Sequence, residues 1–327
     1  MLANLLVLRY FSLSLSKFCQ LQFNSFLFRV LPFSFSRRYL AALGRLYYLL
    51  NRPEKRLIRT TIAYVFRRRL SSPKLRKVIK GTFRGLFDHY HEKLFVAYSH
   101  FGRLLRFLKT RISFAGEESL KAALSRGNGV LLVTGHFGAV EFLPGVLALK
   151  GYPVSMICRF QTDQLRDSLL ERAHRVSLDI INADDGNVFL AAIRALKQGR
   201  ILITECDEFD EWRHGPQSLW FLDNKLPADR SLEILKKRSG APVVTALLQR
   251  HGRATYTLNL TPIPDGGAPV NEQCLNVLEE AILAHPEQWY QWKKFGKMIH
   301  SRLEVNDARQ ESGYLAPEVG LSIPDQA

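Results

Sequence analysis

The sequence predicts an α/β protein with a mostly parallel sheet flanked by helices, preceded by a basic N-terminal helical region that associates with a membrane. Two observations predict this architecture. From about residue 115, short β-branched or aliphatic runs alternate with helical stretches of ten or more residues. Connections of that length imply crossovers between parallel strands. Before residue 115 the pattern is helical, aromatic and strongly basic.

The net charge of +16 is concentrated in the first quarter of the chain. Residues 1–80 hold 17 Lys and Arg and one acid, Glu54, whereas residues 81–327 hold 29 residues of each sign. A basic segment suits an anionic membrane surface, nucleic acid or an acidic protein. Phe and Tyr crowd the first fifty positions among the basic residues, which favours a membrane interface. No recognisable nucleic-acid-binding motif is present.

The N-terminal segment carries too many charges to predict a transmembrane helix. Its longest charge-free run, Phe18 to Phe28, is far shorter than the ~20 apolar residues that a span requires. No small-residue cleavage site follows an apolar core, so a secretory signal is not expected. An alternative to membrane contact is a set of amphipathic helices packed on the main domain. Four scattered cysteines fit a reducing compartment: Cys19, Cys158, Cys206 and Cys274.

These patterns divide the chain into four regions. Residues 1–50 are predicted to form interfacial helices, and residues 51–114 a basic helical region packed on the core. Residues 115–303 are predicted to form the α/β core, and residues 304–327 a loose tail. Within the second region, the Ser71-Ser72-Pro73 break indicates the end of one helix and the start of another.

The core is predicted to contain five strands followed by an antiparallel edge strand. The five strands are Val130–Thr134, Val154–Cys158, Asp179–Ile181, Ile201–Thr204 and Val243–Leu248. The helices among them are Glu117–Ser125, Ala139–Lys150, Asp163–Arg175, Asn187–Gln198 and Ala228–Ser239. The alternating segment Thr255–Leu260 predicts the edge strand, and a last helix covers Asn271–Ala284.

The segment 129–142 holds the strongest candidate for chemistry. An apolar strand ends just before His136, Gly138 permits a tight turn, and a helix begins directly afterwards. His136 therefore lies at the carboxyl end of a strand, where parallel sheets place ligands. On a continuous helix, His136 and Glu141 would point about 140° apart. They can meet only if His136 lies in the turn and Glu141 in the first turn of the helix.

In that arrangement Glu141 holds one imidazole nitrogen of His136 and leaves the other nitrogen as a general base. No Gly-x-Ser-x-Gly element and no suitably placed cysteine is present, so the base would act on a substrate hydroxyl. Alternatively, His136 caps the turn and Glu141 complements the helix N-terminus. A metal is not expected, because no third ligand recurs nearby and His-Glu-x-x-His is absent.

This segment and several ordered blocks after it resemble the bacterial lipid A biosynthesis acyltransferases, within the wider glycerolipid acyltransferase group. Gly135–Glu141 resembles the family's strand–Gly-His-x-Gly-x-x-Glu segment. Over about residues 40–300, further blocks occur in the family's order. They are Met156–Arg159, Ala195–Arg200, Glu205–Asp207, Ala228–Leu248 and Pro286–Trp289.

The resemblance implies that His136, with Glu141 as its partner, deprotonates a hydroxyl that attacks an acyl thioester of acyl carrier protein or coenzyme A. It also implies substrate-binding roles for Arg159, Asp207 and Gly138, with Arg159 binding phosphate or developing negative charge. The simpler alternatives are a surface ion pair for Arg159 and a turn for Asp207. No bound cofactor is expected.

The implied partners are an acyl carrier protein or acyl-CoA, a membrane lipid such as a lipid A precursor, and an anionic membrane surface. The implied location is the cytoplasmic face of a bacterial inner membrane, and nucleic acid is not an expected partner. Three departures concern the acceptor: Ala139-Val140 replaces Asn-Trp, Trp292-Lys293-Lys294 replaces His-Arg-Arg, and Phe221–Asn224 replaces a Phe-Gly turn.

These departures keep a phospholipid or aminolipid acceptor as an alternative. A second alternative is a membrane or lipid-binding protein that keeps the fold without turnover. A third is a nucleic-acid-binding protein, whose binding would be salt-sensitive and independent of His136.

Overall fold

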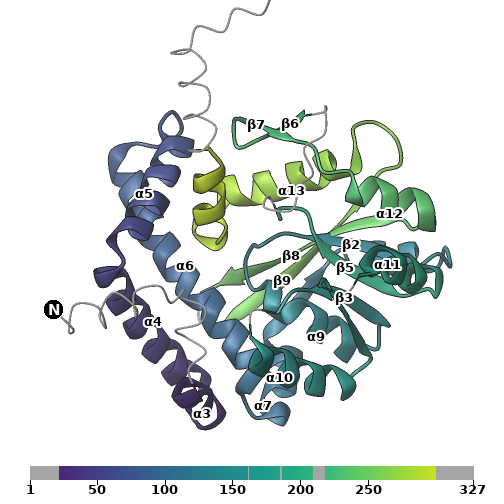
Figure 1. The fold of residues 1–327 in the computed structure, drawn as a ribbon, viewed down its shortest axis with the longest axis horizontal. Coiled ribbons are helices and arrows are strands. Elements are labelled where there is room, and N and C mark those ends of the chain that lie inside the picture. The colour runs from purple at the N-terminus through teal and green to yellow at the C-terminus, as the bar shows by residue number, and fades with distance from the viewer. Residues whose placement is uncertain (1–21, 161, 185, 209–217, 253, 300–327) are drawn as a thin grey trace, which may run out of the picture.

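A seven-stranded sheet lies at the centre of the computed structural model, which describes residues 22–160, 162–184, 186–208, 218–252 and 254–299 (Figure 1). The strand order is β1-β9-β8-β2-β5-β3-β4. All neighbours run parallel except β8 and β9, so the predicted mostly parallel α/β sheet is confirmed. The strands are β1 Ile112–Ala115, β2 Val130–Thr134, β3 Val154–Cys158, β4 Leu178–Asn182, β5 Ile201–Glu205, β8 Val243–His251 and β9 Thr255–Ile263.

The central strands are apolar because both of their faces are covered. Every residue of β2 is buried, as is most of β5 and β8. Continuous apolar runs of this kind are typical of parallel sheets with helices on both sides. The helices of this part are α8 Glu117–Leu124, α9 Leu143–Leu149, α10 Asp163–His174, α11 Val188–Lys197, α12 Ser231–Ser239 and α13 Val270–Ala284, with short 3-10 turns η1 Val140–Phe142 and η3 Pro286–Gln288.

β9 is antiparallel to β8 as predicted, but it is not an edge strand. β1 lies outside it, pairing Ile112 with Tyr256 in a parallel register. All of β1 except Ala115 falls inside residues 51–114, which the sequence predicted to be helical. Its four residues alternate between half-buried and exposed, and a run this short gains its strand conformation from pairing with β9.

A hairpin, β6 Ser218–Phe221 and β7 Asn224–Pro227, was also not predicted. Its two turn residues, Leu222 and Asp223, both have positive φ, of 49° and 59°. Two-residue hairpin turns of this hand usually contain Gly or Asn. Here Asn224 Nδ2 donates to the Leu222 carbonyl at 2.5 Å, and Glu279 accepts from the Leu222 amide at 2.9 Å. The turn therefore forms without the glycine that the resemblance implies at this place.

The N-terminal helices form a layer beside the sheet (Figure 1). They are α3 Gln22–Val30, α4 Phe33–Leu50, α5 Arg52–Phe66, α6 Ser72–Tyr98 and α7 Phe101–Arg111. α4 packs closely on α6, since a Cβ at Gly44 would overlap the Phe87 ring. Arg37 binds Asp88 through two bonds of 2.6 and 2.7 Å across the same interface.

One hydrophobic cluster runs from these helices into the sheet, which fixes the position of α6 beside the carboxyl end of β2. The predicted helix break near residue 71 is confirmed, since α5 ends at Phe66 and α6 begins at Ser72. The tail predicted for residues 304–327 lies outside the described residues, and so do residues 1–21 of the interfacial helices predicted for residues 1–50.

Candidate active site

His136 and Asp207 meet because they follow neighbouring strands in the same register. Thr134 of β2 pairs with Glu205 of β5, and the two side chains come two residues later on each strand. His136 Nδ1 lies 2.9 Å from Asp207 Oδ1. The His136 backbone amide donates to both oxygens of that carboxylate, at 3.1 and 3.0 Å. Asp207 therefore fixes both the imidazole ring and the turn that carries it.

Asp207 is fully buried and has a third donor. The indole Nε1 of Trp289 donates to its Oδ2 at 2.7 Å. A carboxylate that accepts several hydrogen bonds is held in one orientation. The resemblance implied a substrate-binding role for Asp207. In the structure Asp207 lies behind His136 and orients the imidazole.

Glu141 does not make the imidazole contact that the sequence predicted. It lies in η1, as expected, but its Oε1 faces α6, 3.5 Å from Lys93 Nζ and 3.7 Å from His89 Nε2. A distant segment holds the turn between His136 and η1 in place, because the Gly138 amide donates to the Gln288 carbonyl at 2.9 Å. The backbone of this turn directs the Glu141 side chain toward α6, and Asp207 makes the contact with the imidazole that was predicted for Glu141.

Gly138 serves the backbone of this turn. Its φ is +60°, and a Cβ would overlap the carbonyl oxygen of Leu248. Its own carbonyl accepts from Arg250, which also binds Glu92 through two bonds of 2.8 Å. Both polar backbone groups of Gly138 are therefore used within the protein, and only glycine fits this close approach.

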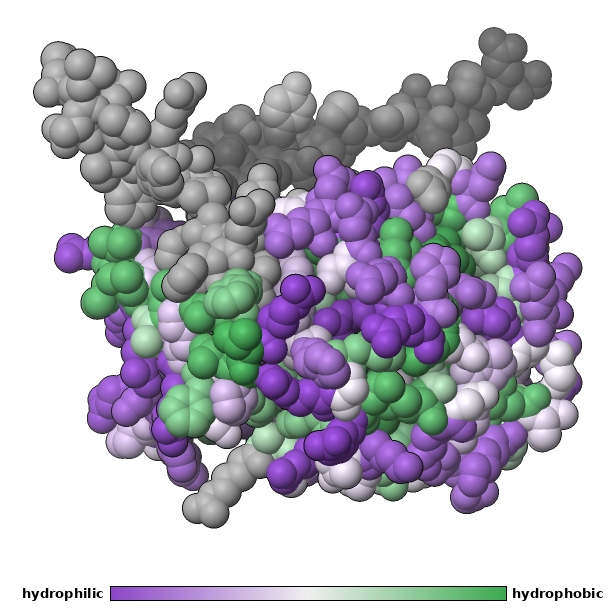
Figure 2. Space-filling view, turned by 90° about the horizontal axis from the view of Figure 1, so that it is seen from below, coloured by the Kyte–Doolittle hydropathy of each residue, from purple (hydrophilic) through white to green (hydrophobic). Residues whose placement is uncertain are grey.

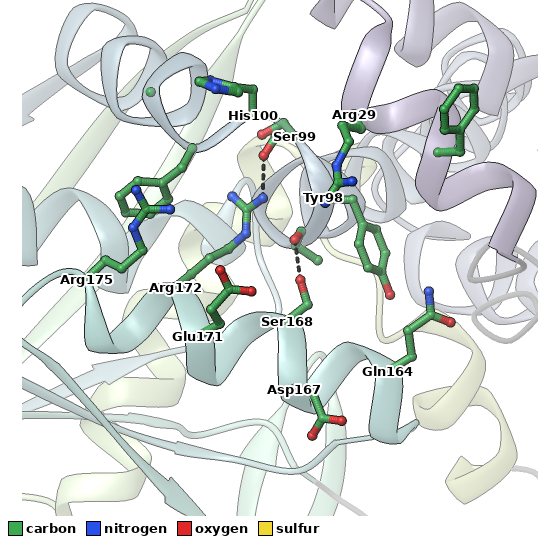
Figure 3. Close-up of a pocket in the computed structure, with 14 residues that line it drawn as sticks. Arg29, Tyr98, Ser99, His100, Gln164, Asp167, Ser168, Glu171, Arg172 and Arg175 are labelled. Atoms are coloured by element: carbon green, nitrogen blue, oxygen red, sulfur yellow. Dashed lines mark hydrogen bonds between the residues drawn. The ribbon is translucent and has the colours of Figure 1, made fainter.

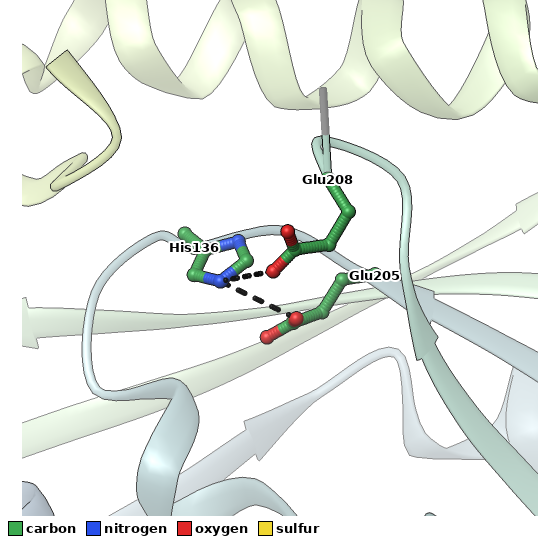
Figure 4. Close-up of side chains that lie close together, drawn as sticks. All are labelled: His136, Glu205 and Glu208. Carbon is green, nitrogen blue, oxygen red and sulfur yellow. Dashed lines mark ion pairs between the residues drawn. The ribbon is translucent and has the colours of Figure 1, made fainter. Parts of the chain in front are cut away.

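Two further carboxylates lie on the opposite side of the imidazole (Figure 4). His136 Nε2 is 3.0 Å from Glu208 Oε1 and 3.3 Å from Glu205 Oε2. Glu208 also binds Lys294 Nζ at 3.0 Å. Glu205 and Glu208 were not predicted as site residues. The signal for them in the sequence is the acidic run Glu205–Glu208 at the carboxyl end of β5.

The ligand atoms of His136, Glu205 and Glu208 lie within 4.8 Å of one another, so these residues could hold a metal ion. One imidazole and two carboxylates suit several divalent metals. In the structure, positive charge among the carboxylates comes from His136 and Lys294.

The carboxylates decide the charge of His136. Burial by itself lowers the pKa of an imidazole, but the charges of Glu205 and Asp207 and the bonds to Asp207 and Glu208 raise the pKa of His136 well above its usual value. Burial raises the pKa of Glu205 to about 7. Burial also opposes ionisation of Glu208, yet its contacts with His136 and Lys294 lower its pKa to about 2. At neutral pH the imidazolium form of His136 is therefore favoured.

A cavity of about 940 Å³ extends from this cluster. His136, Glu141, Glu205 and Glu208 line it, together with an apolar part from α7, β3, α10 and β4: Leu104, Leu108, Met156, Leu165, Leu169 and Ile180. Basic residues line another part: Lys93, Arg159, Lys293, Lys294 and Lys297. Figure 1 shows α7 and α10 well separated from the C-terminal helical segment 292–299 that carries most of these lysines.

Arg159 lies on the cavity wall at the end of β3, with a half-exposed side chain. Its Nε donates to Asp184 Oδ1 at 2.9 Å. Arg159 therefore lies at the cavity, as a substrate-binding residue would, and it also forms the surface ion pair that the alternative interpretation predicted.

The segment 288–290 closes the site from the C-terminal side. The Tyr290 amide donates to the His136 carbonyl at 3.2 Å, and the Tyr290 ring packs edge-on against the imidazole with centroids 5.0 Å apart. The Tyr290 ring also stacks on the imidazole of His89, with centroids 3.5 Å apart. Trp289 belongs to one of the blocks that resemble the family, but Tyr290 was not predicted as a site residue. Its position depends on contacts with His89 and His136, which lie far from it in the sequence.

His136, Asp207 and Trp289 lie within a part of the chain that matches a known family. The family model for bacterial lipid A biosynthesis acyltransferases matches residues 4–301. The chain belongs to this family. A comparison with curated proteins gave no match.

Family membership makes the chain an acyltransferase enzyme that uses an acyl donor and a lipid acceptor. The matched residues include β2, β5 and the segment 288–290, which together hold His136. For this acyltransferase, the cavity beside the imidazole is therefore the candidate place for both substrates.

Proposed function

We propose that this acyltransferase moves a fatty acyl group from a thioester of acyl carrier protein or coenzyme A to a hydroxyl of a membrane glycolipid such as a lipid A precursor. One observation supports this most strongly. A single cavity joins an apolar part, a basic part and the imidazole of His136. An acyl chain fits the apolar part, and a phosphorylated headgroup fits the lysines.

In the proposed reaction His136 is the general base. Nδ1 carries a proton and donates it to Asp207 in a hydrogen bond. Nε2, which lies beside the cavity-lining Glu205 and Glu208, is then the basic nitrogen. Glu205, whose pKa burial raises to about 7, first takes the Nε2 proton of the imidazolium. The acceptor hydroxyl then takes the place of Glu205 and Glu208 at Nε2 and gives its proton to the neutral imidazole. Its oxygen forms a bond to the thioester carbonyl carbon, the carbon–sulfur bond breaks, and the departing thiolate takes the proton from His136. The products are an ester and a free thiol.

Glu141 has a different role in this proposal from the one first predicted. Its carboxylate fixes the Lys93 ammonium at the cavity wall, at 3.5 Å. Lys93, Lys297 and Arg159 then supply positive charge for the acceptor phosphate or for the negative charge that develops on the thioester oxygen.

The membrane-facing surface in this proposal is the outer side of α3 and α4. Large apolar side chains are exposed there, with Phe26 60% and Leu49 63% accessible. Arg29, Arg38 and Arg45 lie in the same helices. Figure 2 shows apolar residues gathered on the left of its view, the side on which Figure 1 places α3 and α4.

Apolar and basic side chains in one surface suit an anionic membrane. None of the described helices is long and apolar enough to cross a bilayer. The proposed location is the cytoplasmic face of a bacterial inner membrane, to which the apolar and basic surface of α3 and α4 would bind.

The experiment is a transfer assay with the purified full-length chain. The donors are radiolabelled acyl carrier protein and acyl-CoA thioesters, and the acceptors are a hydroxyacylated phosphoglycolipid, a phospholipid and an aminolipid. We expect labelled phosphoglycolipid whose label is released by mild alkali, as an ester requires. Binding without label transfer from either donor would indicate a lipid-binding protein. Alkali-stable label would show that the product is an amide.

A further inference from the structure

A second cavity, of about 820 Å³, lies beside the first. α3, the end of α6, the beginning of α7 and α10 enclose it (Figure 3). Phe101 and Arg172 line both cavities, whereas His136 lines only the first. The second cavity is therefore a neighbour of the proposed catalytic site and does not contain its reacting groups.

Hydrogen bonds between α10 and the end of α6 fix one wall of the second cavity. Ser168 Oγ donates to the Ala97 carbonyl at 2.5 Å, and Arg172 Nη2 donates to the Ser99 carbonyl. Figure 3 shows both bonds crossing between the two helices. Arg172 is thereby held in place from its Nη2 side.

Three arginines line the cavity, and the acidic side chains around them are too few to pair with all three. Arg172 Nη1 is buried and has no hydrogen-bond partner among the described residues. Arg175 lies over the Phe101 ring at 4.0 Å. Neither Arg175 nor Arg29 forms an ion pair within the described ranges. The lining contains two acidic residues, Asp167 and Glu171. Asp167 forms an ion pair with Arg166 at 3.2 Å, so Glu171 is the remaining acidic residue of the lining near the three arginines.

Burial lowers the pKa of Arg172 to about 10. That value is still well above neutral pH, so Arg172 remains cationic. A buried guanidinium N–H without an acceptor is costly, and an anion in the cavity would supply one. The first turn of α7 adds backbone donors, because the His100 side chain does not cap that helix.

We infer that the second cavity binds the phosphate group of a membrane lipid, through Arg29, Arg172 and Arg175. Guanidinium groups match phosphate oxygens in geometry and charge. A lipid is the expected carrier because the exposed Phe26 lines the same cavity and continues onto the apolar surface of α3. This inference does not depend on which acceptor the enzyme acylates.

The experiment measures binding of dihexanoyl phosphatidic acid and of inorganic phosphate to the full chain by calorimetry. The cavity variant is Arg29→Gln with Arg175→Gln, since neither side chain is in a described ion pair. The control is Lys74→Gln with Arg76→Gln, which removes the same charge from exposed positions at the start of α6. We expect the cavity variant to bind the lipid at least about tenfold more weakly, and the control to bind like the wild type.

A second variant tests the cavity without removing an arginine. A Cβ at Gly102 would meet only ordinary contacts with His100 at 3.6 Å. Gly102→Glu places a carboxylate in the first turn of α7, where it suits the helix and competes with phosphate. We expect Gly102→Glu to lose binding, Gly102→Ala to keep it, and all variants to melt near the wild-type temperature.

The His136→Ala variant should bind the lipid normally, which separates this site from the catalytic cavity. Three results would each overturn the inference: no binding of the lipid to the wild type, equal binding by the cavity variants, or inorganic phosphate binding as tightly as the lipid.

Discussion

Asp207→Asn is the substitution that most sharply tests the geometry of the imidazole. The buried Asp207 carboxylate accepts from the His136 amide, His136 Nδ1 and Trp289 Nε1. An asparagine offers one acceptor oxygen and turns an NH₂ group toward these donors. At least one buried donor loses its partner, which costs about 1–3 kcal/mol of stability.

The effect on catalysis should be larger than this cost suggests. Without the anion at Nδ1, His136 favours the tautomer whose Nε2 carries the proton, and that nitrogen cannot accept one from the acceptor. We expect kcat to fall by roughly a hundredfold or more, equivalent to about 3 kcal/mol in the barrier. KM should change little, because Asp207 does not line the cavity. Steady-state kinetics with a fixed acyl thioester measure both constants.

Glu141→Gln is the matched control, since it removes the other candidate partner of His136. It should weaken the hold on Lys93 and raise KM, while the pH dependence of kcat stays as in the wild type. If Asp207→Asn kept activity within about fivefold and Glu141→Gln shifted the pH profile instead, the assignment of Asp207 to the imidazole would be refuted.

Three further predictions concern charge, backbone and cavity. Glu205→Gln removes a charge 3.3 Å from Nε2, an attraction of ~5 kcal/mol before desolvation is considered. The loss of this negative charge lowers the pKa of His136, so the rise of kcat/KM with pH should occur about one pH unit or more lower than in the wild type. A rise at the same pH as in the wild type would contradict this. Gly138→Ala should lower the melting temperature and abolish activity, whereas Gly199→Ala, at φ +76° with open space around it, should cost only ~1 kcal/mol. Leu169→Trp should shorten the acyl chain that the enzyme prefers and Leu169→Ala lengthen it, measured with a series of thioesters; the same preference in both variants would exclude Leu169 from the acyl-binding part.

The sheet could be predicted where the signal is local. β2, β3 and β5 are apolar runs separated by long helices, and the predicted bounds match the structure to within a residue. β1 could not be predicted in this way, because four residues directly after α7 become a strand only by pairing with β9. The edge position given to β9 failed for the same reason.

The candidate site shows the same division between local and distant information. The position of His136 after β2 follows from the local pattern, and it is confirmed. The partner of His136 does not follow from the local pattern. The short separation in sequence favoured Glu141, but Gln288 and Leu248, which are far along the chain, hold the turn in place. The register of β2 and β5 is what brings Asp207 to the imidazole, and that register exists only in the folded sheet.

Lipid mass spectrometry of cells tests the central claim most directly. Cells that lack the protein are complemented with the wild type, with His136→Ala, or with His174→Ala as a control at an exposed position of α10. The proposal predicts a glycolipid heavier by one acyl group with the wild type and with His174→Ala, and its absence with His136→Ala at equal protein level. Full restoration of the acylated lipid by His136→Ala would contradict the role of His136 as the general base.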